Sequence, residues 1–218
     1  MKKNNLKKLV SKLPKHPNVL GRDRFFNSAV LIPLVKIDGE YHLIFQKRAA
    51  HIRQGGDICF PGGGFESDVD KDFKDTALRE TYEELGIPKK DIKILGQLDT
   101  YVAPIGAIIE SFVARVKKKA YNNMKIDHNE VEKTIVIPIS FFKDNEPKEY
   151  TLAHEIQPYK IDENGNKEIF FPVEELGLPD TYKKPWGNKR HKIWVYEYEG
   201  EVIWGITSVL IKDVIDKY

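Results

Sequence analysis

The sequence predicts an α+β fold in which a few helices pack against a sheet. Strand-like segments are mixed with helical ones, and they lack the regular strand–helix alternation of a doubly wound sheet. The 218 residues can bury a proper core, and they contain no repeat, linker or low-complexity stretch. We therefore expect a single domain over residues 1–218, with an N-terminal arm over 1–20 and an irregular insertion or covering segment over 143–192.

The first half of the chain is expected to form a hairpin, a short strand and a helix. Residues 28–49 contain two strand-like runs around Asp38-Gly39, a dipeptide typical of tight hairpin turns. Residues 57–60 give a third short strand, which ends at a proline and three glycines. A helix from about Asp72 to Leu85 follows, because Gly86 comes next as a stop signal.

The second half is expected to add strands and a terminal helix. Residues 91–104 and 107–116 resemble strands separated by a Pro-Ile-Gly break, and residues 132–142 give another strand. Residues 192–218 resemble a hairpin followed by a terminal helix. Between them, residues 143–192 are rich in Pro, Asn, Gly and mixed charge, which indicates loops and hairpins that cover one side of the core.

Composition bounds the class of protein. The chain carries 35 basic and 33 acidic residues, so its charge of +2 does not indicate nucleic acid, and we expect no such partner. Residues 1–15 are basic and amphipathic, which predicts a short helix docked on the body, with a membrane-surface role as the alternative. No apolar stretch long enough for a signal peptide or a membrane span follows, and Cys59 is the only cysteine. We expect a cytoplasmic protein without a membrane partner.

The helix over 72–85 concentrates negative charge. A helical wheel gives it a core-facing stripe of Leu78, Thr81, Tyr82 and Leu85, with the glutamates Glu80, Glu83 and Glu84 on the opposite side. Glu80 and Glu84 are like charges four residues apart, and each such pair costs about 0.2–0.5 kcal/mol. Glu83 and Glu84 also lie at the negative end of the helix dipole. Both the like-charge repulsion and the helix dipole therefore destabilise this placement of the glutamates.

A divalent cation would resolve this repulsion. Mg²⁺ or Mn²⁺ prefers oxygen ligands, so Glu80, Glu83 and Glu84 are candidate metal ligands, and a solvated acidic face is the alternative. Arg79 can hold one of these carboxylates in place by a bidentate contact. The preceding glycines let the backbone approach the ion and substrate, and Gly62 or Gly63 could offer a carbonyl to the metal.

The same segment resembles the Nudix box, G-x5-E-x7-R-E-U-x-E-E-x-G-U, where U is apolar. RETYEELGI, residues 79–87, fits every invariant position of its second half, with Thr81 in place of an aliphatic residue. The first half differs, because Gly63 to Arg79 is two residues longer than the pattern. Glu66 is a candidate match for the glutamate of a frequent G-G-x-x-E start, and Asp68 or Asp70 is a candidate for the first glutamate of the box.

The resemblance implies an α/β/α sandwich around a mixed sheet. It also implies hydrolysis of a diphosphate linked to another moiety, with Glu80, Glu83 and Glu84 binding the catalytic Mg²⁺ or Mn²⁺ ions. The family takes its general base from different places, so Glu83, Glu84 or the loop residue Glu130 could serve. A solvated loop charge is the alternative for Glu130.

A second resemblance is to the coenzyme A pyrophosphatase branch of the family. KRAAHIRQGGDICFPGG, residues 47–63, is similar to its signature, and VIWGITSVLI, residues 202–211, to its tail. The branch implies cleavage of coenzyme A or acyl-CoA to 3′,5′-ADP and 4′-phosphopantetheine or its acyl form. Arg48 and Arg53 are then candidates for binding substrate phosphates, and surface arginines that flank a strand end are the alternative.

Two other functions stay open on the sequence. One is hydrolysis of another nucleoside diphosphate derivative, such as ADP-ribose, NADH, a dinucleotide or an oxidised nucleotide. The other is a binding module without turnover, which the intact Arg79 and glutamate set disfavours. KKPWGNKRHKIW, residues 183–194, could stack an adenine and hold a 3′-phosphate, could bind single-stranded RNA by the same physics, or could be a basic hairpin without a ligand. The substrate partner is a small molecule, and a homodimer is left open.

Overall fold

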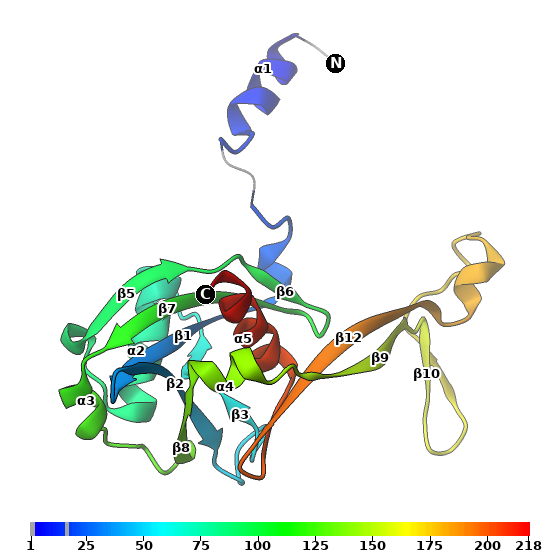
Figure 1. Ribbon diagram of the computed structural model, residues 1–218. Helices are drawn as coiled ribbons and strands as arrows, with labels where there is room; N and C mark the ends of the chain where they lie inside the picture. Colours follow the sequence, from blue (N-terminus) through cyan, green and yellow to red (C-terminus); the bar gives the residue numbers. More distant parts are fainter. Residues whose placement is uncertain (1–2, 16–17) are drawn as a thin grey trace.

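The computed structural model describes residues 3–15 and 18–218. An eight-stranded mixed sheet forms its centre (Figure 1). The strands follow the order β3-β2-β1-β7-β5, while β4 pairs with β1, β6 with β7 and β8 with β2. Their bounds are β1 Phe26–Ile37, β2 Glu40–Arg48, β3 Ile58–Cys59, β4 Gly62–Gly64, β5 Ile92–Gln97, β6 Tyr101–Ala103, β7 Ala107–Val116 and β8 Val131–Pro138.

The expected hairpin is confirmed as β1 and β2. Asp38 and Gly39 adopt φ values of 47° and 94°, the left-handed conformations that a tight hairpin turn requires. The register places Leu34 opposite Leu43, so apolar side chains of the two strands share a face. β1 also pairs with β7 in parallel over nine residues, which makes the sheet mixed.

Helices cover both faces of this sheet, so the predicted α+β sandwich is confirmed. The long helix α2 (Phe73–Leu85) and the short α3 (Lys118–Asn122) pack on one face. Helices α4 (Ile139–Asp144) and α5 (Gly205–Lys217) pack on the other, where Phe142, Leu210 and Ile211 join the main apolar cluster. Short 3₁₀ turns lie at Arg22–Arg24, Lys89–Asp91 and Asp180–Lys183.

Two local expectations differ from the structure. Residues 132–142 do not form one strand, because β8 ends at Pro138 and the chain continues as α4. The N-terminal helix α1 (Lys3–Lys12) is present, but it is not docked on the described part of the body (Figure 1). Leu6, Leu9, Val10 and Leu13 stay 48–59% exposed.

Residues 143–192 were expected to form loops and hairpins that cover one side of the core; paired strands are present, but their first strand covers no core. Beyond α4, the strands β9 (Lys148–Ile156) and β12 (Trp186–Tyr198) pair as a ribbon that projects from the body (Figure 1). The small hairpin of β10 (Tyr159–Ile161) and β11 (Lys167–Ile169) lies near its outer end. The inner end of β12 pairs with β13 (Glu201–Ile203) against the body. Every residue of β9 is exposed, so this strand covers no core.

Candidate active site

Helix α2 presents its acidic end to the sheet. Asp72 caps its start by accepting a hydrogen bond from the Asp75 backbone at 2.8 Å, and Gly86 ends it in the left-handed conformation. Glu84 is only 2% exposed, whereas Tyr82 is 59% exposed. The expected stripe is therefore wrong at both positions. Ala77, Thr81 and Glu84 follow i, i+4, i+7 spacing, which turns this carboxylate inward.

Glu84 is held between two strands. Gln46 of β2 donates a hydrogen bond from Nε2 to Oε1 at 2.6 Å, and the Gly62 backbone N–H donates to Oε2 at 2.9 Å. Burial raises the pKa of Glu84 to about 8, even though both hydrogen bonds act in the opposite direction. The charges of Glu80 and Glu130 raise it further. A pKa this high means that no nearby positive charge stabilises the ionised form of Glu84.

Arg79 is the anchor of the acidic cluster. Its Nε and Nη2 donate to the two oxygens of Asp70, each at 2.9 Å, which is a bidentate ion pair. The Asp70 side chain is 2% exposed and also accepts a hydrogen bond from Thr76 Oγ1 at 2.9 Å. The Arg79 contact lowers the pKa of Asp70 to about 2. The structure thus selects Asp70, rather than the exposed Asp68, as the partner of Arg79.

Arg79 also reaches two of the candidate metal ligands. Its Nη1 donates to Glu80 at 2.8 Å and to Glu83 at 2.9 Å, so it orients both carboxylates while its bidentate contact goes to Asp70. The Glu80 side chain is 14% exposed and that of Glu83 is 52% exposed. Burial raises the pKa of Glu80, and Arg79 opposes this shift. Glu66 lies at the margin, 3.9 Å from Arg79 Nη2.

Glycines of β4 make room for these carboxylates. A Cβ on Gly63 would lie 2.3 Å from Glu80 Oε1, so only glycine lets the strand pass the carboxylate at this distance. Gly62 has a φ of 155°, and a Cβ there would lie 2.3 Å from the backbone oxygen of Ala29. The two glycines expected to approach the site therefore do so, Gly63 beside Glu80 and Gly62 beside Glu84.

Glu130 and the arginines lie at the adjoining loops. The Glu130 carbonyl accepts a hydrogen bond from the Ala49 N–H at 2.9 Å, which ties its loop to the end of β2. Its carboxylate is exposed, and its negative charge adds to the raised pKa values of Glu80 and Glu84. Arg48 lies two residues beyond Gln46 in β2, and its Nε donates to the Arg53 carbonyl at 3.1 Å. The Arg53 side chain is exposed.

The residues present fit a divalent cation by their chemistry. Within residues 3–15 and 18–218, no three acidic, His or Cys side chains form a ready-made ligand group. The reason is that Arg79 holds Glu80 and Glu83, whereas Glu84 is bound to Gln46 and Gly62. The site nevertheless combines hard oxygen donors with raised carboxylate pKa values, which a cation would relieve.

Sequence reasoning missed Gln46 and left Asp70 undecided. Gln46 is 1% exposed, and its Oε1 has no partner in the described structure. Its one available signal was a polar residue inside the apolar run HLIFQ. The segment from Gly63 to Arg79 is two residues longer than the pattern, so the sequence could not show whether Asp68 or Asp70 matches the first glutamate of the box. The structure shows that Asp70 contacts Arg79.

The protein is a mixed sheet between helices, and the acidic end of α2 lies against the glycine strand β4. Its class is therefore that of α+β proteins with a site built from carboxylates, here called the carboxylate centre. The model of the NUDIX domain matches residues 26–195 of this sequence, which include the whole centre. The chain therefore belongs to the Nudix family, and the resemblance of residues 79–87 to its box is confirmed. Proteins of this family generally use divalent metal ions.

Three relatives illustrate the similarity. Nudix hydrolase 3 of Caenorhabditis elegans is 36% identical over 145 residues, which cover 61% of this chain and 57% of that protein. The mitochondrial coenzyme A diphosphatase NUDT8 of Homo sapiens is 30% identical over 132 residues, covering 60% and 56%. The Nudix hydrolase NudL of Yersinia pestis is 27% identical over 208 residues, covering 92% and 86%.

The chain thus spans less than two thirds of the length of the first two relatives and most of the third. Among the described helices, the longest have 13 residues, and none is long and apolar enough to cross a membrane.

Proposed function

We propose that this protein is a Mg²⁺- or Mn²⁺-dependent pyrophosphohydrolase that cleaves the diphosphate of coenzyme A or acyl-CoA. The products would be 3′,5′-ADP and 4′-phosphopantetheine or its acyl form. The observations that carry the proposal are that Arg79 holds Glu80 and Glu83, and that Glu84 of the same helix accepts a hydrogen bond from the Gly62 N–H of the glycine strand. The similarity to a relative named as a coenzyme A diphosphatase supports the substrate class.

The carboxylates would hold the metal. Glu80, Glu83 and Glu84 supply oxygen ligands, and the Gly62 carbonyl is a further candidate. When bound, a divalent ion neutralises the charge of the diphosphate and lowers the pKa of a water molecule. Arg79 keeps Glu80 and Glu83 oriented, and Asp70 fixes Arg79 so that this orientation costs no rearrangement during the reaction.

Arg48 and Arg53 would bind substrate phosphates. Gln46 and Arg48 lie on the same strand two residues apart, so alternation directs both toward the face that carries Glu84. The hydrogen bond from Arg48 Nε to the Arg53 carbonyl leaves the two Nη groups of Arg48 available for a bidentate contact. Arg53 projects from the adjacent loop, where it can meet a second phosphate.

Glu130 would accept the proton of the attacking water. Its loop is fixed at the backbone by Ala49, whereas its carboxylate stays exposed beside the cluster. Glu130→Gln should lower kcat by about 10²–10⁴-fold, because the neutral amide cannot accept the proton. Glu132→Gln, an exposed neighbour on β8, is the matched control and should retain activity. Equal kcat values for the two variants would remove Glu130 from the mechanism.

A substrate panel tests the proposal directly. The protein is incubated with Mg²⁺ or Mn²⁺ and with coenzyme A, acetyl-CoA, ADP-ribose, NADH or a diadenosine polyphosphate, and the products are separated by chromatography and weighed by mass spectrometry. We expect 3′,5′-ADP and 4′-phosphopantetheine from coenzyme A, with the highest kcat/KM. Preference for ADP-ribose would overturn the coenzyme A assignment. Absence of release from every substrate would indicate a binding module.

A further inference from the structure

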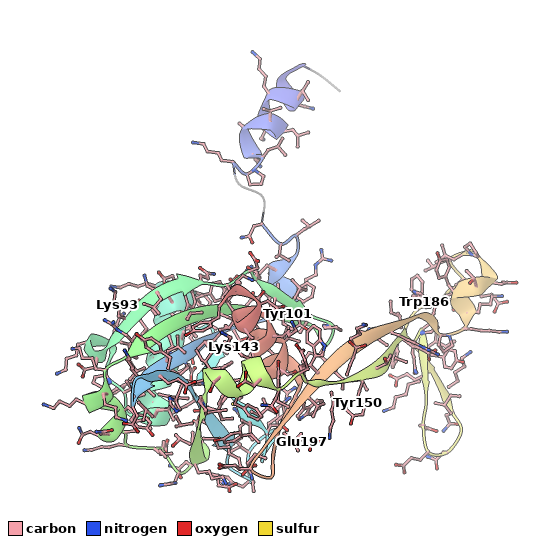
Figure 2. The ribbon with its side chains drawn as sticks, in the orientation of Figure 1. Lys93, Tyr101, Lys143, Tyr150, Trp186 and Glu197 are labelled. Atoms are coloured by element: carbon pink, nitrogen blue, oxygen red, sulfur yellow. The ribbon has the colours of Figure 1, made fainter. Side chains whose placement is uncertain are left out.

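The N-terminal helix α1 takes no part in the proposed hydrolase site. It stands apart from the body in Figure 1, and Figure 2 shows its side chains clear of those of the body. The chain is fastened to the body at Arg22, which forms an ion pair with the buried Glu110 of β7. The Arg22 guanidinium also lies 5.0 Å from the centre of the Phe73 ring in α2. Helix α1 lies beyond this anchor and is joined to it by residues 13–21.

One side of α1 is apolar. Leu6, Leu9, Val10 and Leu13 follow i, i+3, i+4, i+7 spacing, so they form a stripe about 100° wide, which we call the apolar stripe. Leu13 directly follows the helix, but its N–H donates to the Val10 carbonyl at 3.2 Å, which keeps it in the last turn. From residue 5 to residue 13, no charged side chain falls within the stripe. All four side chains are exposed, and no described element of the chain covers them.

The other sides of α1 are basic. On a wheel of 100° per residue, Lys7, Lys8 and Lys12 all fall outside the stripe, and Lys15 follows the helix. These four lysines are exposed, and residues 5–15 contain no acidic residue. The segment therefore combines a bare apolar stripe with positive charge of a single sign, although the whole chain is close to neutral at +2.

This combination selects a negatively charged lipid surface as the occupant. A helix of this kind lies in the plane of the membrane interface, with its apolar side in the acyl boundary and its lysines among the headgroups. A soluble polyanion such as nucleic acid would attract the lysines but would leave the stripe in water. An uncharged apolar groove would cover the stripe but would gain nothing from the lysines. An anionic bilayer surface uses both features at once.

We propose that α1 binds the surface of an anionic lipid bilayer and holds the body beside it. The ten residues of α1 give a helix about 15 Å long, which lies along the surface because it is too short to cross a hydrocarbon core of about 30 Å. The apolar stripe enters the headgroup boundary, and the lysines stay at the headgroups. This contact replaces the expected docking of the helix on the body, and it is independent of the proposed hydrolysis.

Co-sedimentation of the full chain with lipid vesicles tests the proposal. One set of vesicles is phosphatidylcholine alone, and the other contains about 30% phosphatidylglycerol. We expect the partition coefficient to be at least about 30-fold higher on the anionic vesicles at low salt, and to fall as salt screens the lysines. Equal partition on the two sets of vesicles would overturn the role assigned to charge.

Glutamine substitutions test the apolar stripe without a change of charge. Leu6→Gln/Leu9→Gln should lower the partition coefficient on anionic vesicles at least about tenfold, because the stripe loses apolar area. Asn5→Gln/Ser11→Gln is the matched control, since it places the same two glutamines outside the stripe, and it should change the coefficient less than about twofold. Equal binding by the two double variants would overturn insertion of the stripe, because the lysines alone would then carry the binding.

Lysine substitutions test the electrostatic part. Lys7→Gln/Lys8→Gln should lower the partition coefficient on anionic vesicles by about 25-fold, since each lysine near such a surface contributes about fivefold. The same variant should leave the weaker binding to phosphatidylcholine alone unchanged. A variant that bound anionic vesicles as wild type does would contradict the proposal.

A thermal melt of each variant without lipid gives the remaining control. The melting temperature should stay at the wild-type value, because α1 packs on no described part of the body. A lower melting temperature in Leu6→Gln/Leu9→Gln would overturn the proposal, since the stripe would then dock on the body. Wild-type protein that stays in the supernatant with both sets of vesicles would also overturn it, and the stripe would then belong to a protein partner.

Discussion

At the scale of single residues, Asp70 and Glu84 are two buried carboxylates with opposite electrostatics. Asp70 has a guanidinium as its partner, and its pKa falls to about 2. Glu84 has only a neutral amide and a backbone N–H, and its pKa rises to about 8. The fold thus supplies fixed positive charge to the structural carboxylate and withholds it from the one that faces the proposed metal.

Asp70 should support stability against acid. Its folded pKa of about 2 lies below the ordinary pKa of an aspartate, so its contribution is complete above about pH 4 and is lost as pH falls toward 2. Asp70→Asn should lower the free energy of unfolding at pH 7 by about 2 kcal/mol, measured by urea denaturation. Asp68→Asn, at an exposed neighbour, should change nothing. Equal losses in both variants would contradict the assigned pair.

In metal-free protein, Glu84 should make the free energy of unfolding fall as pH rises, which is opposite to the effect of Asp70. Its folded pKa of about 8 lies above the ordinary pKa of a glutamate, so between these two values the native state keeps a proton that the unfolded chain has lost. The free energy of unfolding in the presence of a chelator should therefore fall as pH rises from about 4.5 to 8, by on the order of 4 kcal/mol.

Glu84→Gln should abolish most of this pH dependence, because the amide does not titrate. Glu83→Gln is the control, since that carboxylate is half exposed and should leave the slope in place. A Glu84→Gln profile with the wild-type slope would show that another group holds the proton.

At the scale of elements, the glycine strand β4 and the end of α2 must lie in contact for the site to exist. Gly63→Ala would push its Cβ against the carboxylate of Glu80, a flexible side chain that can move away. We expect at least tenfold lower turnover, with the free energy of unfolding changed by no more than about 1 kcal/mol. Urea denaturation and kcat/KM on coenzyme A measure the two effects.

Gly62→Ala is the matched comparison, because there the clash is with the backbone of β1. It should lower the free energy of unfolding by at least about 2 kcal/mol, since neither strand can give way easily. If the two alanine variants had the same stability and the same activity, the assigned distinction between the two glycines would be incorrect.

Local signals predicted those elements whose ends are set by nearby residues. The Asp38–Gly39 turn and the Gly86 stop are chemical features of two or three residues, so the hairpin and helix α2 could be placed from the sequence. The inward turn of Glu84 could not, because carboxylates usually avoid the core and its partners Gln46 and Gly62 come from distant strands. The sequence predicted that Glu80, Glu83 and Glu84 belong together. It did not predict that Arg79 would hold the first two while Gln46 holds Glu84.

At the scale of the whole molecule, the helix and sheet layers of the body could be predicted from the sequence, but the projecting ribbon of β9 and β12 could not. Mixed strand and helix patterns indicate a sandwich, and helices do cover both faces of the sheet. β9 lacks a strong apolar–polar alternation because both of its faces are exposed and neither packs on a core. Pro and Gly in the segment indicated loops and hairpins, but not the pairing of β9 with β12, which joins distant residues such as Lys148 and Val195.

The proposed hydrolysis requires a cation between the carboxylates of Glu80, Glu83 and Glu84 at the C-terminal end of α2. The most direct measurement is an anomalous difference map at the manganese edge, from crystals grown with Mn²⁺. We predict a peak within ligand distance of Glu80, Glu83 and Glu84, about 2.0–2.3 Å from their oxygens, and its loss in crystals of Glu80→Gln/Glu84→Gln. A map without density there, or a manganese peak that survives in the double variant, would contradict the account.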